Sequence, residues 1–306
     1  MSRWCQSVSK RVKYIVGCPA WERAWSLPLW FESVKANVPP EDTGLLFVVP
    51  PPDQMTRDAI NRLSGDFAWC DVMRDKHAQF DRDKRGTADH HRTLALARNQ
   101  IMAKVNQIGP EVFISWDSDL LIQPGLVETW EIEEEPVPLM TVWTWLNRQK
   151  PQTMLHGDPD EEGVRRVQFQ EPMQATAMAW CGNKRAAHLD GSEWDMRAAG
   201  LWRCDVALGF QMMRPEVYTT THYVDHPDGE DIPFNWQLER RGIPRYCYGE
   251  MPGVHLYTRV NEELSLGYPE IMSLADEKPL AAQKTGPRSQ LDELLGFYPV
   301  QEGATQ

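Results

Sequence analysis

Short apolar runs alternate with stretches of helical periodicity over the first 130 residues. Four of these runs are typical of buried strands, at residues 14–17, 45–49, 67–72 and 112–116. Strands that alternate with helices indicate βαβ units. We therefore expect a mainly parallel sheet flanked by helices in this half of the chain.

Helices are predicted between these strands. Residues 27–38 carry apolar side chains at helical spacing, and Pro39 ends that pattern. Residues 94–108 do the same up to Gly109-Pro110. The charged segment 75–89 is too polar for a core, so we expect a mobile loop there.

The pattern changes after residue 130. Strands are predicted at 139–146, 176–181, 206–213 and 243–248, a helix at 233–241 closed by Gly242, and a polar loop at 154–163. This mixture indicates an α+β half. We expect one composite domain over 1–268, with halves 1–130 and 131–268, and a tail at 269–306 that holds one short helix near 291–295.

Composition and charge narrow the class of protein. The 306 residues are 42% apolar and 25% charged, which excludes bulk disorder, collagen and coiled coil. A net charge of −12 disfavours long nucleic acid as a partner. The six cysteines have no Cys-x-x-Cys spacing, and we find neither an apolar leader nor a membrane-spanning run. We therefore expect a soluble cytoplasmic protein.

Asp117 and Asp119 follow the predicted strand at 112–116 directly. Open α/β sheets bind ligands at the carboxyl ends of their strands, and paired carboxylates suit Mn²⁺ or Mg²⁺. The alternative is that both are ordinary turn residues. The apolar residues 120–122 that follow favour a site, because a solvated turn should continue with polar residues.

Five segments together resemble a known family. They are YIVGCPAWERAWSLPLWFESV, LALARNQIMAKV, VFISWDSDLLIQPGLV, GEDIPFNWQLERRGIPRY and GVHLY, in that order along the chain. Their order and spacing resemble a nucleotide-sugar glycosyltransferase of the GT-A fold, nearest the inverting family 2 type. The resemblance implies a GT-A-like α/β fold with a Rossmann-type sheet. It also implies that Asp119 binds a divalent metal and that Asp117 contacts both metal and nucleotide.

The resemblance also implies a nucleotide site around the first strand. Pro19, Ala20, Trp21 and Glu22 follow that strand, where the family holds the base and the ribose. An aromatic face beside a base contributes about 0.5–1.5 kcal/mol beyond its buried area. The alternative is that Trp21 packs at a helix entry and that Glu22 is a solvated first-turn acid. Asp53 matches a less constant acidic position of the same site.

Arg98 and Asn99 lie on the predicted helix at 94–108, off its apolar stripe. In the family resembled, an Ala-Arg-Asn at this place approaches the donor phosphates or ribose. A guanidinium suits a diphosphate because its planar fork binds oxyanions in pairs. The alternative is a surface arginine on an exposed helix face.

Glu230 and Asp231 precede the predicted helix at 233–241. The resemblance implies that Asp231 is the general base that deprotonates the acceptor, with Glu230 beside it raising its pKa. The alternative is that Asp231 caps the helix. His255 matches a histidine that completes the metal shell in several GT-A enzymes, and an imidazole would favour Mn²⁺ over Mg²⁺.

Gly209 and Trp236 are the predicted acceptor-binding residues. Gly209 begins a segment that resembles the strand under the acceptor sugar, and Trp236 is one of thirteen tryptophans whose flat faces could stack on sugar rings. The predicted function is metal-dependent transfer of a sugar from a nucleoside-diphosphate sugar to an acceptor hydroxyl. Retaining transfer, nucleotidyl transfer and non-catalytic carbohydrate binding stay open. The acceptor could be a glycan, a protein, a small molecule or a modified base.

Overall fold

The computed structural model describes residues 12–75, 88–131, 137–146, 177–178, 201–204, 206–207, 209–226, 229–256, 268–269 and 272. Several predicted segments lie outside these residues. They are most of the charged segment 75–89, the loop 154–163, the tail helix 291–295, and all but two residues of the predicted strand 176–181.

Nine strands of the described chain form one sheet, in the order β3–β2–β1–β4–β10–β6–β11–β5, with β8 beside β11. Their bounds are β1 Tyr14–Pro19, β2 Thr43–Val49, β3 Trp69–Arg74, β4 Val112–Trp116, β5 Leu120–Leu121, β6 Leu139–Leu146, β8 Leu201–Cys204, β10 Phe210–Met213 and β11 Arg245–His255. The strands β3, β2, β1 and β4 are all parallel. The parallel sheet predicted for the first half is therefore confirmed.

The second half continues the same sheet with mixed directions. β10 runs antiparallel to both β4 and β6, whereas β6 and β11 are parallel. A separate antiparallel pair joins β7 (Ala177–Met178) to β9 (Val206–Ala207). β10 therefore joins the two halves within one sheet.

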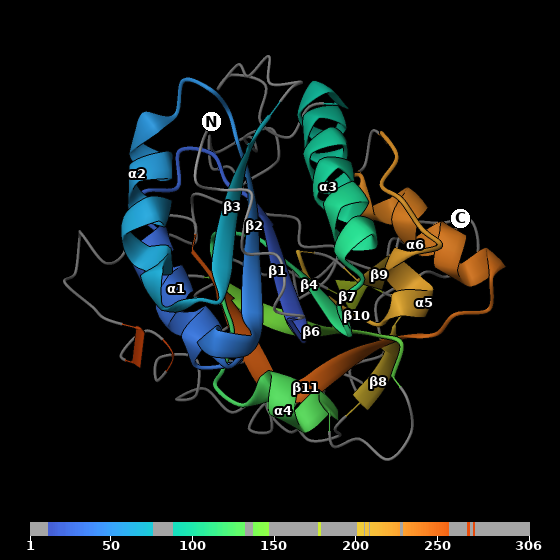
Figure 1. The fold of residues 1–306 in the computed structure, drawn as a ribbon. Coiled ribbons are helices and arrows are strands. Elements are labelled where there is room, and N and C mark those ends of the chain that lie inside the picture. The colour runs from blue at the N-terminus through green and yellow to red at the C-terminus, as the bar shows by residue number, and fades with distance from the viewer. Residues whose placement is uncertain are drawn as a thin grey trace, which may run out of the picture.

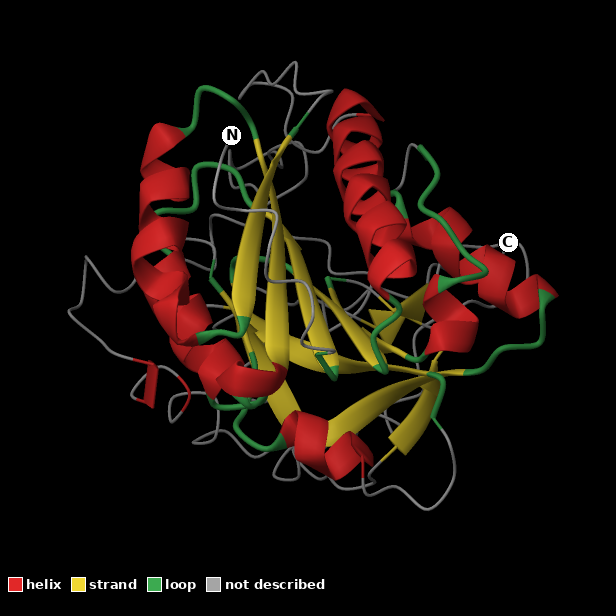
Figure 2. Ribbon diagram, viewed as in Figure 1, coloured by secondary structure: helices red, strands yellow, loops and turns green. Residues whose placement is uncertain are grey.

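Helices cover both faces of this sheet (Figures 1 and 2). Their bounds are α1 Leu27–Lys35, α2 Gln54–Leu63, α3 Ala88–Ile108, α4 Leu126–Glu131, α5 Pro215–Tyr218 and α6 Asp231–Arg240. In the view of Figure 1, α1 and α2 lie on one side of the strands, and α3, α5 and α6 lie on the other. The arrangement is a three-layer α/β fold.

Each face of the sheet has its own hydrophobic core. Val16 of β1 packs with Trp30 of α1 on one face, whereas Ile15 packs with Ile101 of α3 on the other. Successive side chains of a strand point to opposite faces, so one apolar run supplies both cores. Full burial of each such side chain stabilises the fold by roughly 1.5–3 kcal/mol.

Gly17 lets α3 approach β1 closely. A Cβ at this position would lie 2.5 Å from Cγ2 of Ile101 and 2.7 Å from Cε2 of Phe113. Side chains three residues apart share one face of a helix, so Arg98 lies on the same face of α3 as Ile101. The close approach therefore brings Arg98 against the carboxyl end of the sheet.

The structure differs from the sequence prediction at α2 and at residues 206–213, and it also contains α4, which was not predicted. α2 was not predicted, because only Thr56, Ala59 and Ile60 of its ten residues are buried and its apolar pattern is correspondingly sparse. The predicted strand 206–213 is two strands, β9 and β10. Gly209 between them has φ 61°, a left-handed conformation that interrupts an extended chain.

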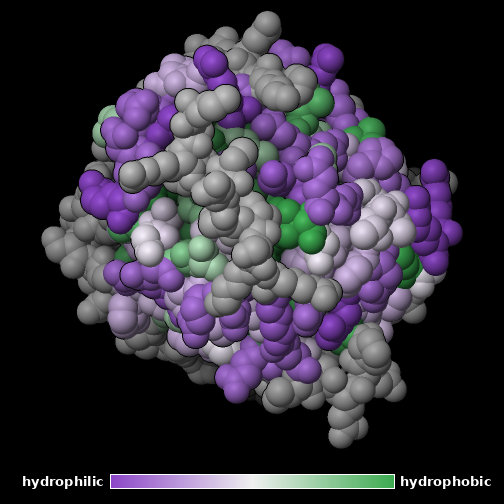
Figure 3. Space-filling model, viewed as in Figure 1, coloured by the Kyte–Doolittle hydropathy of each residue, from purple (hydrophilic) through white to green (hydrophobic). Residues whose placement is uncertain are grey.

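No helix in the described part of the chain has both the length and the hydropathy needed to cross a bilayer. On the face drawn in Figure 3, the coloured surface is mainly hydrophilic, with hydrophobic residues visible only in small areas.

Candidate active site

The turn after β4 carries Asp117 and Asp119. Trp116 is fully buried, and its Nε1 donates to the carbonyl of Leu120 at 2.9 Å. The N–H of Leu120 donates to the carbonyl of Asp117 at 3.1 Å. Both aspartates are thus turn residues, and the turn lies at the carboxyl end of a central strand, where α/β sheets bind ligands. Trp116 belongs to the core and not to an aromatic groove.

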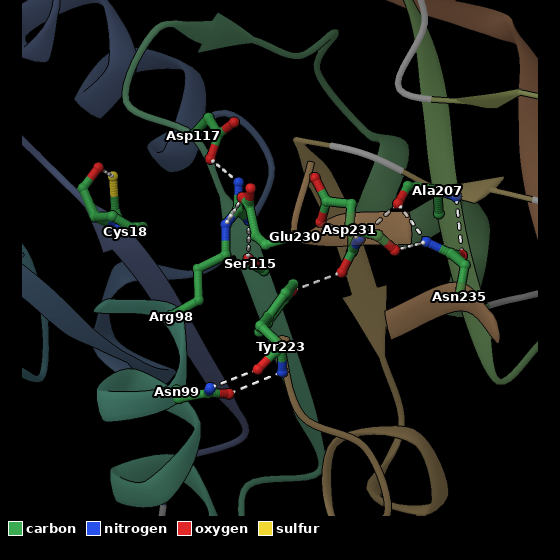
Figure 4. Close-up of polar contacts among 12 residues, drawn as sticks. Cys18, Arg98, Asn99, Ser115, Asp117, Ala207, Tyr223, Glu230, Asp231 and Asn235 are labelled. Atoms are coloured by element: carbon green, nitrogen blue, oxygen red, sulfur yellow. Dashed lines mark hydrogen bonds and ion pairs between the residues drawn. The ribbon is translucent and has the colours of Figure 1, made fainter. Parts of the chain in front are cut away.

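Arg98 is the centre of a buried group of charges (Figure 4). Its side chain is only 3% exposed, and its Nη2 lies 2.8 Å from Oδ1 of Asp117. Its Nη1 donates to Oγ of Ser115 at 3.1 Å, and its Nε forms an ion pair with Oε1 of Glu230 at 3.0 Å. Arg98 is therefore not the exposed surface arginine of the alternative interpretation. Its charged partners among the described residues are carboxylates, so we assign it the positioning of these acids, and its predicted contact with the donor stays a prediction.

The charges of this group shift each other's titration. Burial lowers the pKa of Arg98, but Asp117, Asp231 and Glu230 raise it well above its usual value. Burial raises the pKa of Asp117 to about 6, while Arg98 opposes that rise. Burial also raises the pKa of Glu230, again against the effect of Arg98. Burial thus raises the pKa of each acid around this guanidinium, against the effect of the guanidinium itself.

Asp231 is the first residue of α6 and is 8% exposed. Burial raises its pKa to about 7; Arg98 opposes the rise and Glu230 adds to it. Nε2 of Gln211 donates to its Oδ1 at 3.2 Å. The alternative interpretation of Asp231 as the helix cap is wrong: the capping position is Glu230, without a side-chain capping bond. The carboxylate of Asp231 instead faces β10.

Gln211 connects Asp231 to α3. Its Oε1 accepts a hydrogen bond from the Tyr223 hydroxyl at 2.9 Å. Asn99 holds the backbone of Tyr223 at both its N–H and its carbonyl, at 2.8 and 2.7 Å. The Tyr223 ring lies under Arg98, with Cζ 5.3 Å from the ring centroid. The described contacts of Asn99 therefore orient Tyr223, and its predicted contact with a donor stays a prediction.

Asn235 supports Asp231 from within α6. Its Nδ2 donates to the carbonyls of Asp231 and Ala207 at 2.8 and 3.0 Å, and its Oδ1 accepts from the N–H of Ala207 at 3.0 Å. Asn235 is fully buried. It joins the first turn of α6 to β9 and so fixes the position of Asp231.

Gly209 lies between the two acidic parts of the site. Its carbonyl accepts the N–H of Asp117 at 2.9 Å, and its backbone makes a hydrogen bond that lowers the pKa of Asp231. The left-handed φ of 61° favours glycine here. The described role of Gly209 is thus in the backbone around both aspartates.

Asp119 has a different set of partners. Its Oδ2 lies 2.7 Å from Nη2 of Arg23, and its Oδ1 lies 3.6 Å from Nε2 of His255. Burial lowers the pKa of His255; Asp119 opposes this and Arg23 adds to it. His255 is therefore a neutral imidazole at neutral pH.

The donor set of Asp119 and His255 fits a divalent cation. A carboxylate oxygen and a neutral imidazole nitrogen suit Mn²⁺. The described residues contain no group of three or more His, Cys, Asp or Glu side chains that would form a complete metal site. Two protein ligands are enough for a cation that takes its remaining ligands from water and substrate phosphates.

A second group of predicted residues lines a cavity of about 710 Å³ between the β1–α1 loop and α2. The lining includes Trp21, Glu22, Trp25, Asp53 and Met55. Oδ2 of Asp53 accepts the N–H of Glu22 at 2.6 Å, and its Oδ1 caps α2 at the N–H of Thr56. Asp53 therefore anchors the loop.

Pro19 and Ala20 hold the start of the same loop. Pro19 is the last residue of β1, and the N–H of Ala20 donates to the carbonyl of Val48 at 3.0 Å. Ala20 is 1% exposed. Both residues position the backbone before Trp21.

Trp236 is 42% exposed on α6, and its ring packs edge-on against His226 with 5.2 Å between ring centroids. It lies five residues after Asp231, which places the two side chains on different faces of the helix. An exposed indole is available to a ligand, and acceptor binding by Trp236 stays a prediction.

The sequence did not identify several residues of the site, chiefly Arg23, Gln211, Tyr223 and Asn235. Gln211, Tyr223 and Asn235 are buried, and each makes a hydrogen bond to a different element of the fold. Arg23 stands in the quoted segment CPAWERAW, but its partner Asp119 lies in another motif. The one feature of the sequence that could have indicated Arg23 is its positive charge next to the predicted nucleotide site.

Comparisons with known proteins identify the fold. No family model matches the chain, and no curated protein matches it. A mannosyltransferase from Pyrobaculum calidifontis, solved with GDP-Man and Mn²⁺, has TM-score 0.50 at 11% identity, over 94% of this chain and 69% of that one. TarS 1–349 from S. aureus has TM-score 0.47 at 11% identity, over 93% of this chain and 69% of that one. GalNAc-T7, solved with UDP, GalNAc and Mn²⁺, has TM-score 0.48 at 13% identity, over 80% of this chain and 43% of that one. The likeness to the mannosyltransferase shows that the chain has a GT-A-like α/β fold, as its motifs predicted.

Proposed function

We propose that this protein transfers a glycosyl group from a nucleoside-diphosphate sugar to an acceptor hydroxyl, with inversion at the anomeric carbon. The observation that carries the proposal is Asp231, a buried carboxylate with a pKa of about 7. It lies beside the Arg98–Asp117 pair at the carboxyl end of β4. A general base works best when its pKa is near the working pH.

The donor side of the proposal rests on the fold and on the chemistry of the residues. The mannosyltransferase of similar fold was solved with GDP-Man and Mn²⁺, which supports a nucleoside-diphosphate sugar and a divalent cation for this chain. Asp119 and His255 would hold that cation, with Asp117 close by. A cation bound there would neutralise charge on the departing diphosphate. Trp21 and Glu22 would contact the base and ribose beside the cavity.

The chain's own residues account for the proton transfer. Asp231 accepts the proton of the acceptor hydroxyl while the hydroxyl oxygen forms its bond to the anomeric carbon. The bond from that carbon to the diphosphate oxygen breaks, and the electron pair leaves with the nucleoside diphosphate. Gln211 and the backbone of Gly209 orient the Asp231 carboxylate. Arg98 stays charged throughout and holds Asp117 and Glu230 in place.

A panel of UDP-, GDP- and dTDP-sugars with Mn²⁺ tests the function, with thermal stability and donor hydrolysis as measurements. We expect one donor to raise the melting temperature and to be hydrolysed slowly, with water as acceptor. Formation of a nucleoside triphosphate from pyrophosphate would indicate nucleotidyl transfer instead. Sugar binding without turnover would indicate a carbohydrate-binding protein. The cytoplasmic location expected from the sequence is also part of this proposal.

A matched pair of variants tests the base. Asp231→Asn should lower the transfer rate by about 10²–10⁴-fold, because a positioned general base contributes that much. Asp225→Asn makes the same change at an exposed position nearby and should keep the wild-type rate. If Asp231→Asn kept near-full transfer while Asp119→Ala abolished it, the inverting mechanism would be wrong and a retaining one would replace it.

A further inference from the structure

Arg23 shares the carboxylate of Asp119 with His255. Its Nη2 lies 2.7 Å from Oδ2 of Asp119, while Nε2 of His255 lies 3.6 Å from Oδ1. The side chains of Arg23, Asp119 and His255 are 23%, 10% and 22% exposed. A guanidinium cation therefore already lies against the carboxylate that, in the proposed function, binds a divalent cation.

The backbone of Arg23 is fixed while its side chain extends from it. The N–H of Arg23 donates to Oγ1 of Thr56 at 3.0 Å, and the N–H of Glu22 donates to Oδ2 of Asp53 at 2.6 Å. Glu22 has φ 50°, a left-handed conformation that is uncommon outside glycine. These bonds hold the loop on the N-terminus of α2. The Arg23 side chain can therefore move by rotation without movement of the loop.

The guanidinium of Arg23, a divalent cation and a diphosphate can exchange binding partners with one another. A divalent cation competes with a guanidinium for the same carboxylate oxygens, since both bind through positive charge. A diphosphate is a good alternative partner for the guanidinium, because planar guanidinium groups bind phosphate oxygens in pairs. Once a cation binds Asp119, Arg23 loses its carboxylate, and the donor diphosphate beside the cation offers a replacement.

We propose that Arg23 is a donor-diphosphate-binding residue that occupies Asp119 until the donor and its cation arrive. This inference rests on the proposed function, because it assumes a nucleoside-diphosphate donor at Asp119. In the donor-free protein the Arg23–Asp119 ion pair opposes cation binding. In the loaded protein Arg23 binds the diphosphate. The same side chain thus weakens binding of the cation alone and strengthens binding of the nucleotide.

Two binding measurements on Arg23→Gln test this opposite effect. Mn²⁺ binding without nucleotide is measured by the EPR signal of free Mn²⁺, and binding of GDP and of UDP at saturating Mn²⁺ by tryptophan fluorescence. We expect Arg23→Gln to bind Mn²⁺ about tenfold more tightly than wild type and the preferred nucleotide about tenfold more weakly. A purely structural role for Arg23 would weaken both. Arg23→Lys keeps the charge without the fork and should lie between wild type and Arg23→Gln.

Control variants separate this effect from a general change in charge. Arg62 is exposed on α2 and lines the cavity between α2 and the β1–α1 loop. Arg62→Gln removes one positive charge there and should leave Mn²⁺ affinity unchanged. Asp119→Asn should lose Mn²⁺ binding both alone and combined with Arg23→Gln. Circular dichroism of each variant reports whether it is folded.

The outcomes distinguish this inference from the proposed function. Unchanged or weaker Mn²⁺ binding by Arg23→Gln overturns the inference, as does unchanged nucleotide affinity or the absence of Mn²⁺ binding in every variant. Each of these results leaves the transferase function in place if donor hydrolysis persists. Tighter Mn²⁺ binding without hydrolysis of any donor leaves the competition at Asp119 standing and contradicts the function.

Discussion

At the scale of single residues, the carboxylates around Arg98 outnumber the one positive charge that faces them. One guanidinium faces the carboxylates of Asp117, Glu230 and Asp231, all of which have raised pKa values. Burial disfavours the charged form of a carboxylate, so each such group lowers the stability of the fold when it ionises. The site therefore loses some stability by burying Asp231, a carboxylate that titrates near neutral pH and is the proposed base.

Asp231→Asn should make the protein more stable at alkaline pH. The folded-state pKa of Asp231, about 7, lies above its unfolded value, so the stability linked to its protonation is complete at acid pH and lost as pH rises through 7. Asn does not ionise. The variant should thus gain stability relative to wild type between pH 5 and pH 8.5, by up to a few kcal/mol at about 1.4 kcal/mol per pKa unit.

Urea unfolding of both proteins at several pH values measures this difference. Asp225→Asn, an exposed change, should show no pH-dependent difference from wild type. A difference for Asp231→Asn that is constant from pH 5 to pH 8.5 would contradict the raised pKa.

Single residues of the site were predictable where they stand in a local motif. Asp117 and Asp119 follow a predicted strand and Asp231 precedes a predicted helix, and the structure places each at the carboxyl end of the sheet or beside it. The partners of Arg98 were not predictable, because Glu230 is 132 positions away and only the packing of α6 against β9 and β10 brings it close. Arg23 and Asp119 likewise meet only through the order of strands in the sheet.

At the scale of elements, α3 and α2 determine where the site forms. α3 packs on β1 through Gly17, and α2 holds the β1–α1 loop through Asp53. α3 and β1 were predicted because their apolar positions have clear helical and strand periods. α2 was missed because most of its ten residues are not buried. The long elements on which the site is built were thus predictable, whereas the helix that orients the loop and the short core helix α4 were not.

Gly17→Ala should destabilise the fold. The added methyl group would lie 2.5 Å from Ile101, and overpacking of a core costs about 1–3 kcal/mol. The displacement of α3 should also lower transfer, because Arg98 is on the same face of that helix. Urea unfolding and donor hydrolysis measure the two effects.

Gly65→Ala is the matched control for Gly17→Ala. A Cβ at position 65 meets nothing within 4 Å, so this change should leave stability the same or slightly higher. Equal stabilities for the two variants would contradict the close approach of α3 to β1.

Asp53→Ala should lower stability and nucleotide binding together. The change removes the cap of α2, which costs about 1 kcal/mol, and releases the N–H of Glu22. The loop that carries Trp21 would then lose its anchor. Urea unfolding and fluorescence titration with GDP and UDP measure both, and Asp58→Ala, an exposed acid on the same helix, is the control for stability.

The opposite pattern would change the assignment of Asp53. Weaker nucleotide binding at unchanged stability would mean that Asp53 contacts the nucleotide directly, as the sequence resemblance implied. It would contradict the anchoring role inferred from its two backbone hydrogen bonds.

At the scale of the whole molecule, one sheet joins the two halves of the chain. β4 and β6 come from either side of residue 131, and β10 pairs with both. The two hydrophobic cores lie on opposite faces of this shared sheet. The single composite domain over residues 1–268 stays a prediction, which the pairing of β10 supports.

Unfolding in urea should therefore be one cooperative transition. Far-UV circular dichroism follows helices of both halves, and tryptophan fluorescence follows the buried Trp30, Trp116 and Trp130. Because these share one sheet, the two signals should change at the same urea concentration. Two separate midpoints would indicate that the halves on either side of residue 130 are independent domains.

Gly209 has a consequence for how this site can evolve. Its backbone contacts both Asp117 and Asp231, so a change of its φ should disturb the proposed donor site and the proposed base at once. A substitution there is selected against on two grounds, whereas a change at the exposed Trp236 affects neither aspartate. Lineages that acquire new acceptors are therefore expected to vary at Trp236 and to keep glycine at position 209.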